Sequence, residues 1–149
     1  MKIKILTITL LFLLFTLPAR AGGPIDPRFE GVWVATESCQ IDNVLGSGAY
    51  PPENVPATIV IDPASGMMGV LSGLGPGKYK ISQSQSKGNK IYFSSHLTGT
   101  GRTQGTFILS ADGNTITENG FGLWPCKPYA CTCTIKGTFH RKGPAPKKN

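Results

Sequence analysis

The stretch that decides the expected fold is Phe29-Glu30-Gly31-Val32-Trp33-Val34-Ala35-Thr36. It is rich in β-branched and aromatic residues and contains no proline, which is typical of a β-strand. We expect a strand over 30–36 that turns Trp33 inward, because successive side chains of a strand point to opposite faces. The strand leads to Cys39, and we expect a bond made by this cysteine to hold the residues that follow it in place.

An apolar segment precedes this strand. Lys2 and Lys4 form a positive start, Ile5–Leu17 is almost uninterrupted in its apolar character, and Ala19-Arg20-Ala21 has the small-x-small form that signal peptidase accepts. The run is shorter than the ~20 residues of a membrane span. We therefore expect 1–21 to be a signal peptide, with no stable membrane insertion and a periplasmic or secreted mature chain. The alternative is an uncleaved anchor helix.

The rest of the chain has the length of one domain. We expect an extended arm over 22–29, a β-barrel domain over 30–141 and a flexible basic tail over 142–149. Without the leader, twelve basic and eight acidic residues leave a net charge of +4, and five of the basic residues lie in the last fourteen positions. The body is therefore nearly neutral. Because no nucleic-acid-binding motif accompanies the basic tail, we expect no nucleic-acid partner.

Short alternating segments separated by Gly, Pro, Asn and Asp recur through this domain. The expected strands are 30–36, 57–62, 67–72, 78–84, 91–97, 104–110, 114–118 and 131–141. Two longer stretches, Ser38–Pro56 and Gly120–Ala130, are expected to be loops. Regular short strands of this kind favour an all-β fold. We predict an eight-stranded antiparallel up-and-down barrel with no substantial helix, in which the last strand pairs with the first and removes the exposed edges.

Cysteine usage agrees with export. The mature chain contains Cys39, Cys126, Cys131 and Cys133, and an even count in an exported small domain indicates disulfides. A metal site that adds His140 is the alternative, but its ligand spacing matches no usual zinc pattern. If the last strand pairs with the first, Cys39 lies beside the beginning of the last strand. We expect a bridge from Cys39 to Cys131 or Cys133, and Cys126 paired with the cysteine that remains.

Three features resemble lipocalins and other small calycin-type barrels. Gly31-Val32-Trp33 lies on the first strand, the longest loop follows that strand, and Arg141 ends the last strand on its inner face. The resemblance implies that Gly31, Trp33 and Arg141 close one end of the barrel, with the guanidinium stacked on the indole. Function is then expected at the opposite, loop end.

Two functions remain open. The lipocalin resemblance implies a small apolar ligand or a partner at the loop end, and the candidate contacts are Val44, Leu45, Tyr50, Phe121, Leu123, Trp124 and Tyr129. The layout is also similar to small exported bacterial inhibitors of proteases and of lysozyme. That resemblance implies a protein target, contacted by the 22–28 arm or by the loop Trp124–Tyr129.

The sequence contains only weak motifs for catalysis. Gly73–Lys78 lacks the first glycine and the Ser/Thr of a phosphate-binding loop, so we interpret it as a turn. His96 and His140 are the only histidines, and neither lies in a nucleophile motif. No two carboxylates have a spacing that indicates acid–base chemistry. We predict a monomer that is not an enzyme and that uses no cofactor and no metal.

Overall fold

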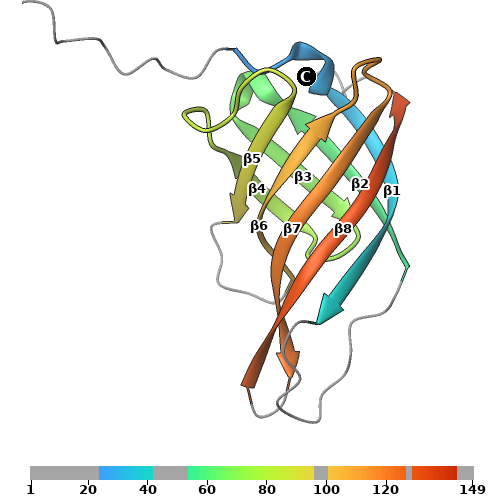
Figure 1. The fold of residues 1–149 in the computed structure, drawn as a ribbon, viewed down its shortest axis with the longest axis vertical. Helices are drawn as coiled ribbons and strands as arrows, with labels where there is room; N and C mark the ends of the chain where they lie inside the picture. The colour runs from blue at the N-terminus through green and yellow to red at the C-terminus, as the bar shows by residue number, and fades with distance from the viewer. Residues whose placement is uncertain (1–23, 42–53, 96–100, 127–128, 144–149) are drawn as a thin grey trace, which may run out of the picture.

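The computed structural model of the chain describes residues 24–41, 54–95, 101–126 and 129–143 (Figure 1). Eight antiparallel strands close into a barrel in chain order, and the last strand pairs with the first, which confirms the predicted fold. The strands are β1 (Gly31–Ile41), β2 (Val55–Asp62), β3 (Met67–Ser72), β4 (Gly77–Ile81), β5 (Lys90–Ser95), β6 (Gly101–Leu109), β7 (Thr115–Cys126) and β8 (Tyr129–Gly143). In the described ranges the helical turns are η1 (Pro27–Phe29) and η2 (Pro63–Ser65).

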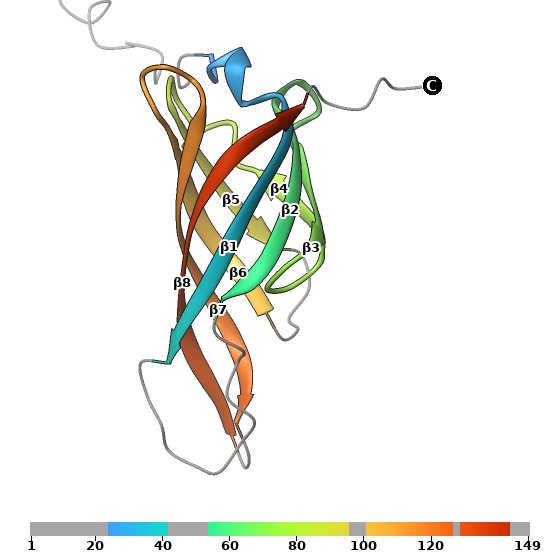
Figure 2. The same cartoon turned by 90° about the vertical axis from the view of Figure 1, so that its right-hand side faces the viewer.

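The barrel has two different ends (Figures 1 and 2). η1, η2 and the turns that follow β4 and β6 lie at one end, which we call the helix end. The turn that follows β3, the end of β7 at Cys126 and the start of β8 at Tyr129 lie at the other, which we call the hairpin end. Because consecutive strands are antiparallel, every second connection returns to the same end.

Buried and exposed side chains alternate along the strands, as expected for a wall with one inner and one outer face. On β4, Tyr79 and Ile81 are buried while Lys80 is exposed, and on β8 Phe139 is buried while Lys136 is exposed. The period of two places apolar side chains in the interior and polar side chains in solvent. This is the pattern on which the strand prediction depended.

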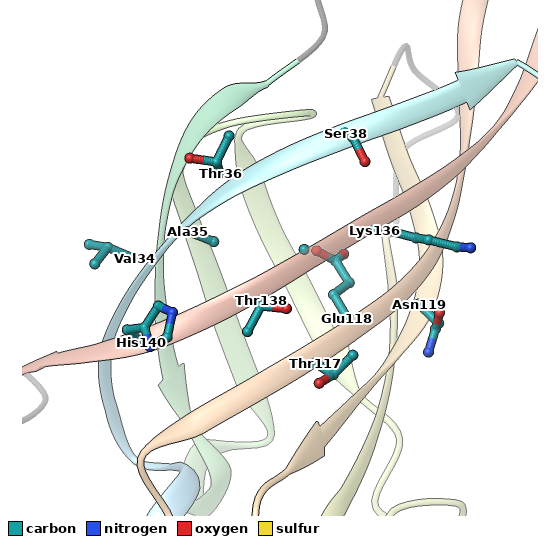
Figure 3. A pocket seen from close by; sticks show the side chains of 11 residues that line it. Val34, Ala35, Thr36, Ser38, Thr117, Glu118, Asn119, Lys136, Thr138 and His140 are labelled. Atoms are coloured by element: carbon teal, nitrogen blue, oxygen red, sulfur yellow. The ribbon is translucent and has the colours of Figure 1, made fainter.

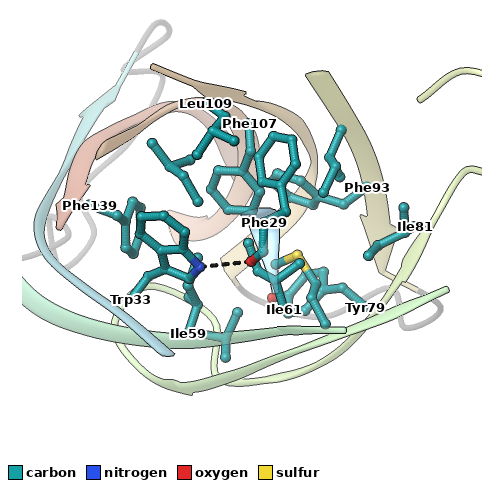
Figure 4. Packing of buried hydrophobic residues seen from close by; sticks show 14 of the residues in the cluster. Phe29, Trp33, Ile59, Ile61, Tyr79, Ile81, Phe93, Phe107, Leu109 and Phe139 are labelled. Carbon is teal, nitrogen blue, oxygen red and sulfur yellow. Dashed lines mark hydrogen bonds between the residues drawn. The ribbon is translucent and has the colours of Figure 1, made fainter. Parts of the chain in front are cut away.

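Aromatic and branched side chains form one cluster in the barrel interior that includes Phe29 at the helix end (Figure 4). The rings of Phe93 and Phe107 stack with centroids 4.7 Å apart, and Phe139 meets Phe107 edge to face at 5.7 Å. Trp33 is fully buried, and its indole N–H donates to the carbonyl of Phe29 at 2.9 Å. η1 thus places Phe29 against the core and closes this end.

Arg141 completes the closure of the helix end. Its guanidinium carbon lies 4.2 Å from the centroid of the Trp33 ring, a cation–π contact of the kind that the sequence suggested. The same group donates to the carbonyl oxygens of Glu30 at 3.0 Å and Gly113 at 3.2 Å, and also to that of Arg28. It therefore joins η1 to the turn that follows β6.

Five strands are longer than predicted. β2 begins at Val55, and β8 extends over Tyr129–Gly143. β1 continues to Ile41, β6 begins at Gly101, and β7 continues to Cys126. The predicted loop over Gly120–Ala130 is therefore wrong, since β7 and β8 pair along most of it. The glycines and the proline of this stretch suggested irregular structure. Pairing with β8 outweighs that local preference, and Pro125 lies beyond the last β6 partner, where a missing N–H is tolerated.

Candidate functional site

The β7–β8 hairpin extends beyond the barrel wall (Figures 1 and 2). β6 pairs with β7 as far as Leu123, and β1 pairs with β8 as far as Cys133. β7 and β8 then continue to pair with each other as far as Cys126 and Tyr129. In the described part of the chain no other strand flanks this outer section. We call it the projecting hairpin, and its described residues are 124–126 and 129–132.

Predicted contact residues divide into three groups. Phe121 and Leu123 lie on β7 at the base of the projecting hairpin, and Phe121 is 36 % exposed. Trp124 and Tyr129 belong to the strands of the projecting hairpin rather than to a loop, and their side chains are outside the described structure. Also outside the described residues are Val44, Leu45 and Tyr50.

A disulfide ties the base of the projecting hairpin to the barrel. Cys39 of β1 is bonded to Cys133 of β8, with their Cα atoms 5.6 Å apart. This is one of the two pairings expected for Cys39. Cys131 is also disulfide-bonded, and the side chain of Cys126 lies outside the described part. A bridge between such distant positions stabilises a fold by ~2–4 kcal/mol, mainly by constraining the unfolded chain.

The connection between β3 and β4, residues 73–76, folds into the hairpin end, and we call it the plug loop. Its Leu74 is only 3 % exposed and packs with Cys133 and Ile135 in a second apolar cluster. Gly73 has φ +117°, and a Cβ there would lie 2.7 Å from both the Cβ of Ala57 and a carboxylate oxygen of Glu37. Only glycine fits this backbone and this space.

A cluster of three charged side chains lies directly beneath the plug loop, and we call it the charged layer. It consists of Glu37 from β1, Arg102 from β6 and Glu118 from β7, and none of the three side chains is exposed. Arg102 Nε donates to Glu118 Oε1 at 2.7 Å, and Nη2 donates to Glu118 Oε2 at 3.2 Å and to Glu37 Oε1. One guanidinium therefore serves two carboxylates.

The charged layer holds the backbone of the plug loop. Glu37 Oε2 accepts the N–H of Leu74 at 2.7 Å, and Arg102 Nη1 donates to the carbonyl of the same residue at 2.7 Å. The hydroxyl of Tyr79 donates to the carbonyl of Gly75. Both polar groups of Leu74 thus have charged partners, which form stronger hydrogen bonds than neutral ones.

Burial changes the acid–base properties of the charged layer. Loss of contact with water raises the pKa of Glu37 to about 7, an effect that Arg102 opposes and Glu118 increases. For Arg102, burial lowers the pKa, but the charge and hydrogen bond of Glu118 outweigh it and the net direction is upward. Arg102 therefore stays charged, and burial makes Glu37 hold a proton to a higher pH than an exposed carboxylate does.

The N-terminal segment packs at the opposite end from the projecting hairpin. Ile25 forms a bridge with Gly88, and the N–H of Asp26 donates to the carbonyl of Gly88 at 2.9 Å. Arg28 donates to the carbonyl of Ala111 at 2.8 Å and pairs with Asp26. The described part of the expected arm, residues 24–29, is therefore held against the barrel.

A groove of about 810 Å³ lies on the outer face of β1, β7 and β8 (Figure 3). Its lining is mostly hydroxyl, amide and charged side chains: Thr36, Ser38, Thr117, Asn119, Lys136, Thr138 and His140. The groove is open to solvent rather than enclosed, so it cannot bury most of the surface of a small ligand.

The described ranges contain one of the two histidines of the chain. His140 is exposed on the outer face of β8, and His96 lies outside those ranges. Within them, no three His, Cys, Asp or Glu side chains are close enough to hold a metal ion. No helix there is long and apolar enough to cross a membrane.

Sequence reasoning missed the charged layer. Arg102 was placed in a link between strands, and Glu37 followed the predicted end of the first strand. Side chains alternate along a strand, so position 37 lies on the same inward face as Trp33 and Cys39. If the first strand had been predicted to continue past residue 36, Glu37 would have been expected to point inward. A carboxylate at an inward position implies a buried partner, because an unpaired buried charge is very costly.

Comparison of the chain with protein-family models, with curated proteins and with solved structures found no match.

Proposed function

We propose that the protein is an exported binding protein that acts without catalysis and docks onto a protein partner through the projecting hairpin. The observation that carries this proposal is the extension of β7 and β8 beyond their last pairs with β6 and β1. A two-stranded arm whose backbone is already paired loses less conformational freedom on binding than an unpaired loop would, which favours affinity. Its sequence, Trp124-Pro-Cys-Lys-Pro-Tyr129, contains the aromatic residues that are common in interface hot spots.

A protein partner fits the structure better than a small apolar ligand. An eight-stranded barrel has room either for side chains or for one small ligand. At the hairpin end Leu74 already fills the interior, and the charged layer lies directly below it. The N-terminal segment is packed at the other end, so it is less suited than the projecting hairpin to enter a target.

Export is part of the proposal. The leader-like residues 1–21 support it, as does the disulfide between Cys39 and Cys133, because such bonds persist in oxidising compartments. Non-catalytic action is inferred because the carboxylate pair Glu37 and Glu118 is buried beneath the plug loop, away from any substrate.

Photo-crosslinking in the native compartment tests the proposal. A photoreactive phenylalanine analogue replaces either Phe121, at the base of the projecting hairpin, or Ile108, on β6 toward the helix end. The two side chains are matched in exposure, at 36 % and 38 %. We expect a discrete protein adduct from position 121 and none from position 108.

A shortened variant provides the control. Residues 124–131 are replaced by Asn-Gly, so that Leu123 and Thr132, which pair across the hairpin, flank a two-residue turn. This change removes Cys126 and Cys131 together and keeps Cys39–Cys133. The adduct should disappear. An adduct that persists, equal labelling from both positions, or a small apolar molecule retained in native mass spectrometry without any adduct would contradict the proposal.

A further inference from the structure

The longest stretch of the chain without an acidic residue forms one side of the barrel. Residues 63–111 contain no Asp or Glu, and they supply β3, β4, β5 and β6. In this stretch Arg102 is buried against two carboxylates, whereas Lys78, Lys80 and Lys87 are exposed. The exposed charge on these four strands is therefore wholly positive.

Two of these lysines lie beside an exposed apolar side chain. Lys78 and Lys80 are on the outer face of β4, opposite Gly69 and Met67 of β3. Leu71 follows Gly69 on the same outer face of β3, and at 65 % it is the most exposed large apolar side chain of the described residues. Nothing lies within 4 Å of the position that a Cβ of Gly69 would take, so the surface between them is open. We call Leu71, Lys78 and Lys80 the basic patch.

Ion pairs do not neutralise the basic patch within the described ranges. The ion pairs found there all join an arginine to a carboxylate, and no lysine takes part. In the strand ladder the closest described acid is Asp62 of β2, which is separated from Lys80 by Met67. The carboxylate of Asp62 accepts the N–H of Ser65 in η2. The basic patch thus presents its charge to solvent, where it attracts anionic groups.

We propose that the basic patch docks the protein on the surface of an anionic phospholipid membrane, without insertion. The lysine ammonium groups attract the anionic headgroups, and Leu71 enters the boundary between headgroups and acyl chains. A protein partner would usually need Trp, Tyr or Arg as anchors, and the outer faces of β3 and β4 carry none of these. Flexible lysine side chains suit the mobile headgroups of a fluid surface.

The basic patch lies on the side of the barrel opposite to β7 and β8. In the closed ring of eight strands, β3 and β4 are each four positions away from β7 and β8 (Figure 1). A membrane against β3 and β4 therefore leaves the outer face of β7 and β8 open. Membrane docking and partner binding by the projecting hairpin do not compete, so each can be tested separately.

Cosedimentation with lipid vesicles tests the proposal. The protein, purified from the compartment in which it accumulates, is mixed with vesicles of phosphatidylcholine alone or of phosphatidylcholine and phosphatidylglycerol in equal parts. We expect binding to the mixed vesicles to be at least about tenfold tighter than to the neutral ones. The difference should disappear when salt is raised from about 0.05 M to about 0.5 M, because screening shortens the reach of the charges.

Two double variants with the same change in net charge locate the docking surface. Lys78→Gln with Lys80→Gln should weaken binding to the mixed vesicles by at least about tenfold, since each lysine near an anionic surface contributes about fivefold. Lys136→Gln with Lys142→Gln is the matched control, at exposed positions of β8 on the other side of the barrel. It should weaken binding by no more than about twofold, because those charges lie farther from the membrane.

A third pair of variants tests the apolar contact. Leu71→Ser should weaken binding severalfold and retain the salt dependence, whereas Ile108→Ser, on β6, should change neither. All of the substituted side chains are exposed, so the variants should fold, and their urea midpoints verify this. The proposal is overturned if mixed and neutral vesicles bind equally, if the two lysine pairs cause equal losses, or if the protein binds polyglutamate, a stand-in for an acidic protein, but neither kind of vesicle.

Discussion

Glu37 on β1 and Glu118 on β7 flank the same residue, Gly137 of β8, which pairs with both of them. Both carboxylates face the barrel interior, and the position between them has no side chain. A Cβ at Gly137 would lie 3.4 Å from Cγ of Glu37 and 3.2 Å from the ring of Phe139. The space left by the absence of a side chain at Gly137 allows two carboxylates from non-adjacent strands to share the guanidinium of Arg102.

Gly137→Ala should therefore destabilise the barrel. The added methyl group lies closer to the Phe139 ring than an ordinary contact allows, so the packed ring must shift, and overpacking of this kind costs about 1–3 kcal/mol. Gly69→Ala is the matched control, because Gly69 also lies in a strand and nothing is within 4 Å of its Cβ position. The control should be neutral or slightly stabilising. Urea unfolding measures both, and equal losses in the two variants would contradict the packing argument.

The global stability should depend on pH through Glu37. Its pKa rises from 4.5 to about 7 on folding, so folding takes up a proton between these values. The corresponding stabilisation is fully present below about pH 4.5 and is lost as pH rises through 7. The difference between the two pKa values amounts to about 3 kcal/mol. Chemical denaturation at pH 5 and pH 8 should show lower stability at pH 8.

Two glutamine variants check that assignment. Glu37→Gln should remove most of the difference between pH 5 and pH 8, whereas Glu30→Gln, at an exposed position just before β1, should leave it unchanged. The assignment to Glu37 fails if both variants retain the wild-type dependence.

Arg102→Met should be the most damaging single change in the charged layer. It leaves two carboxylates buried without a cation, and breaking a buried ion pair in this way typically costs about 3–5 kcal/mol. The triple variant Glu37→Leu, Arg102→Met, Glu118→Leu should recover much of the loss, because no buried charge remains. Thermal unfolding of the two proteins tests this. If the single variant is as stable as wild type, the cluster contributes nothing to the fold.

Arg141→Ala should weaken the helix end by about 1–2 kcal/mol. The change removes the cation–π contact with Trp33 and the hydrogen bonds that join η1 to the turn after β6. His140→Ala, at the neighbouring exposed position, should change stability by less than about 0.5 kcal/mol. Urea midpoints compare the two, and a loss of equal size in His140→Ala would contradict a specific role for Arg141.

Strand periodicity and turn chemistry were enough to predict the barrel. The period of two places Tyr79 and Phe139 inside and Lys80 and Lys136 outside, and it can be observed in the chain without any long-range information. Strand ends were less predictable, because β7 continues through glycines and a proline that favour irregular structure when isolated. Its pairing with β8 supplies the backbone partners that local sequence does not show.

The sequence by itself determined the all-β class, the buried and exposed faces of strands such as 78–84 and 131–141, and the approach of Cys39 to the last strand, because these follow from local alternation and from closure of the barrel. Only the tertiary structure decided that β7 and β8 project beyond the wall and that Glu37, Arg102 and Glu118 meet beneath the plug loop. The three charged residues are 16 or more positions apart in the chain, with no shared motif. The three residues come together only when the strand register places Gly137, which has no side chain, between the two carboxylates.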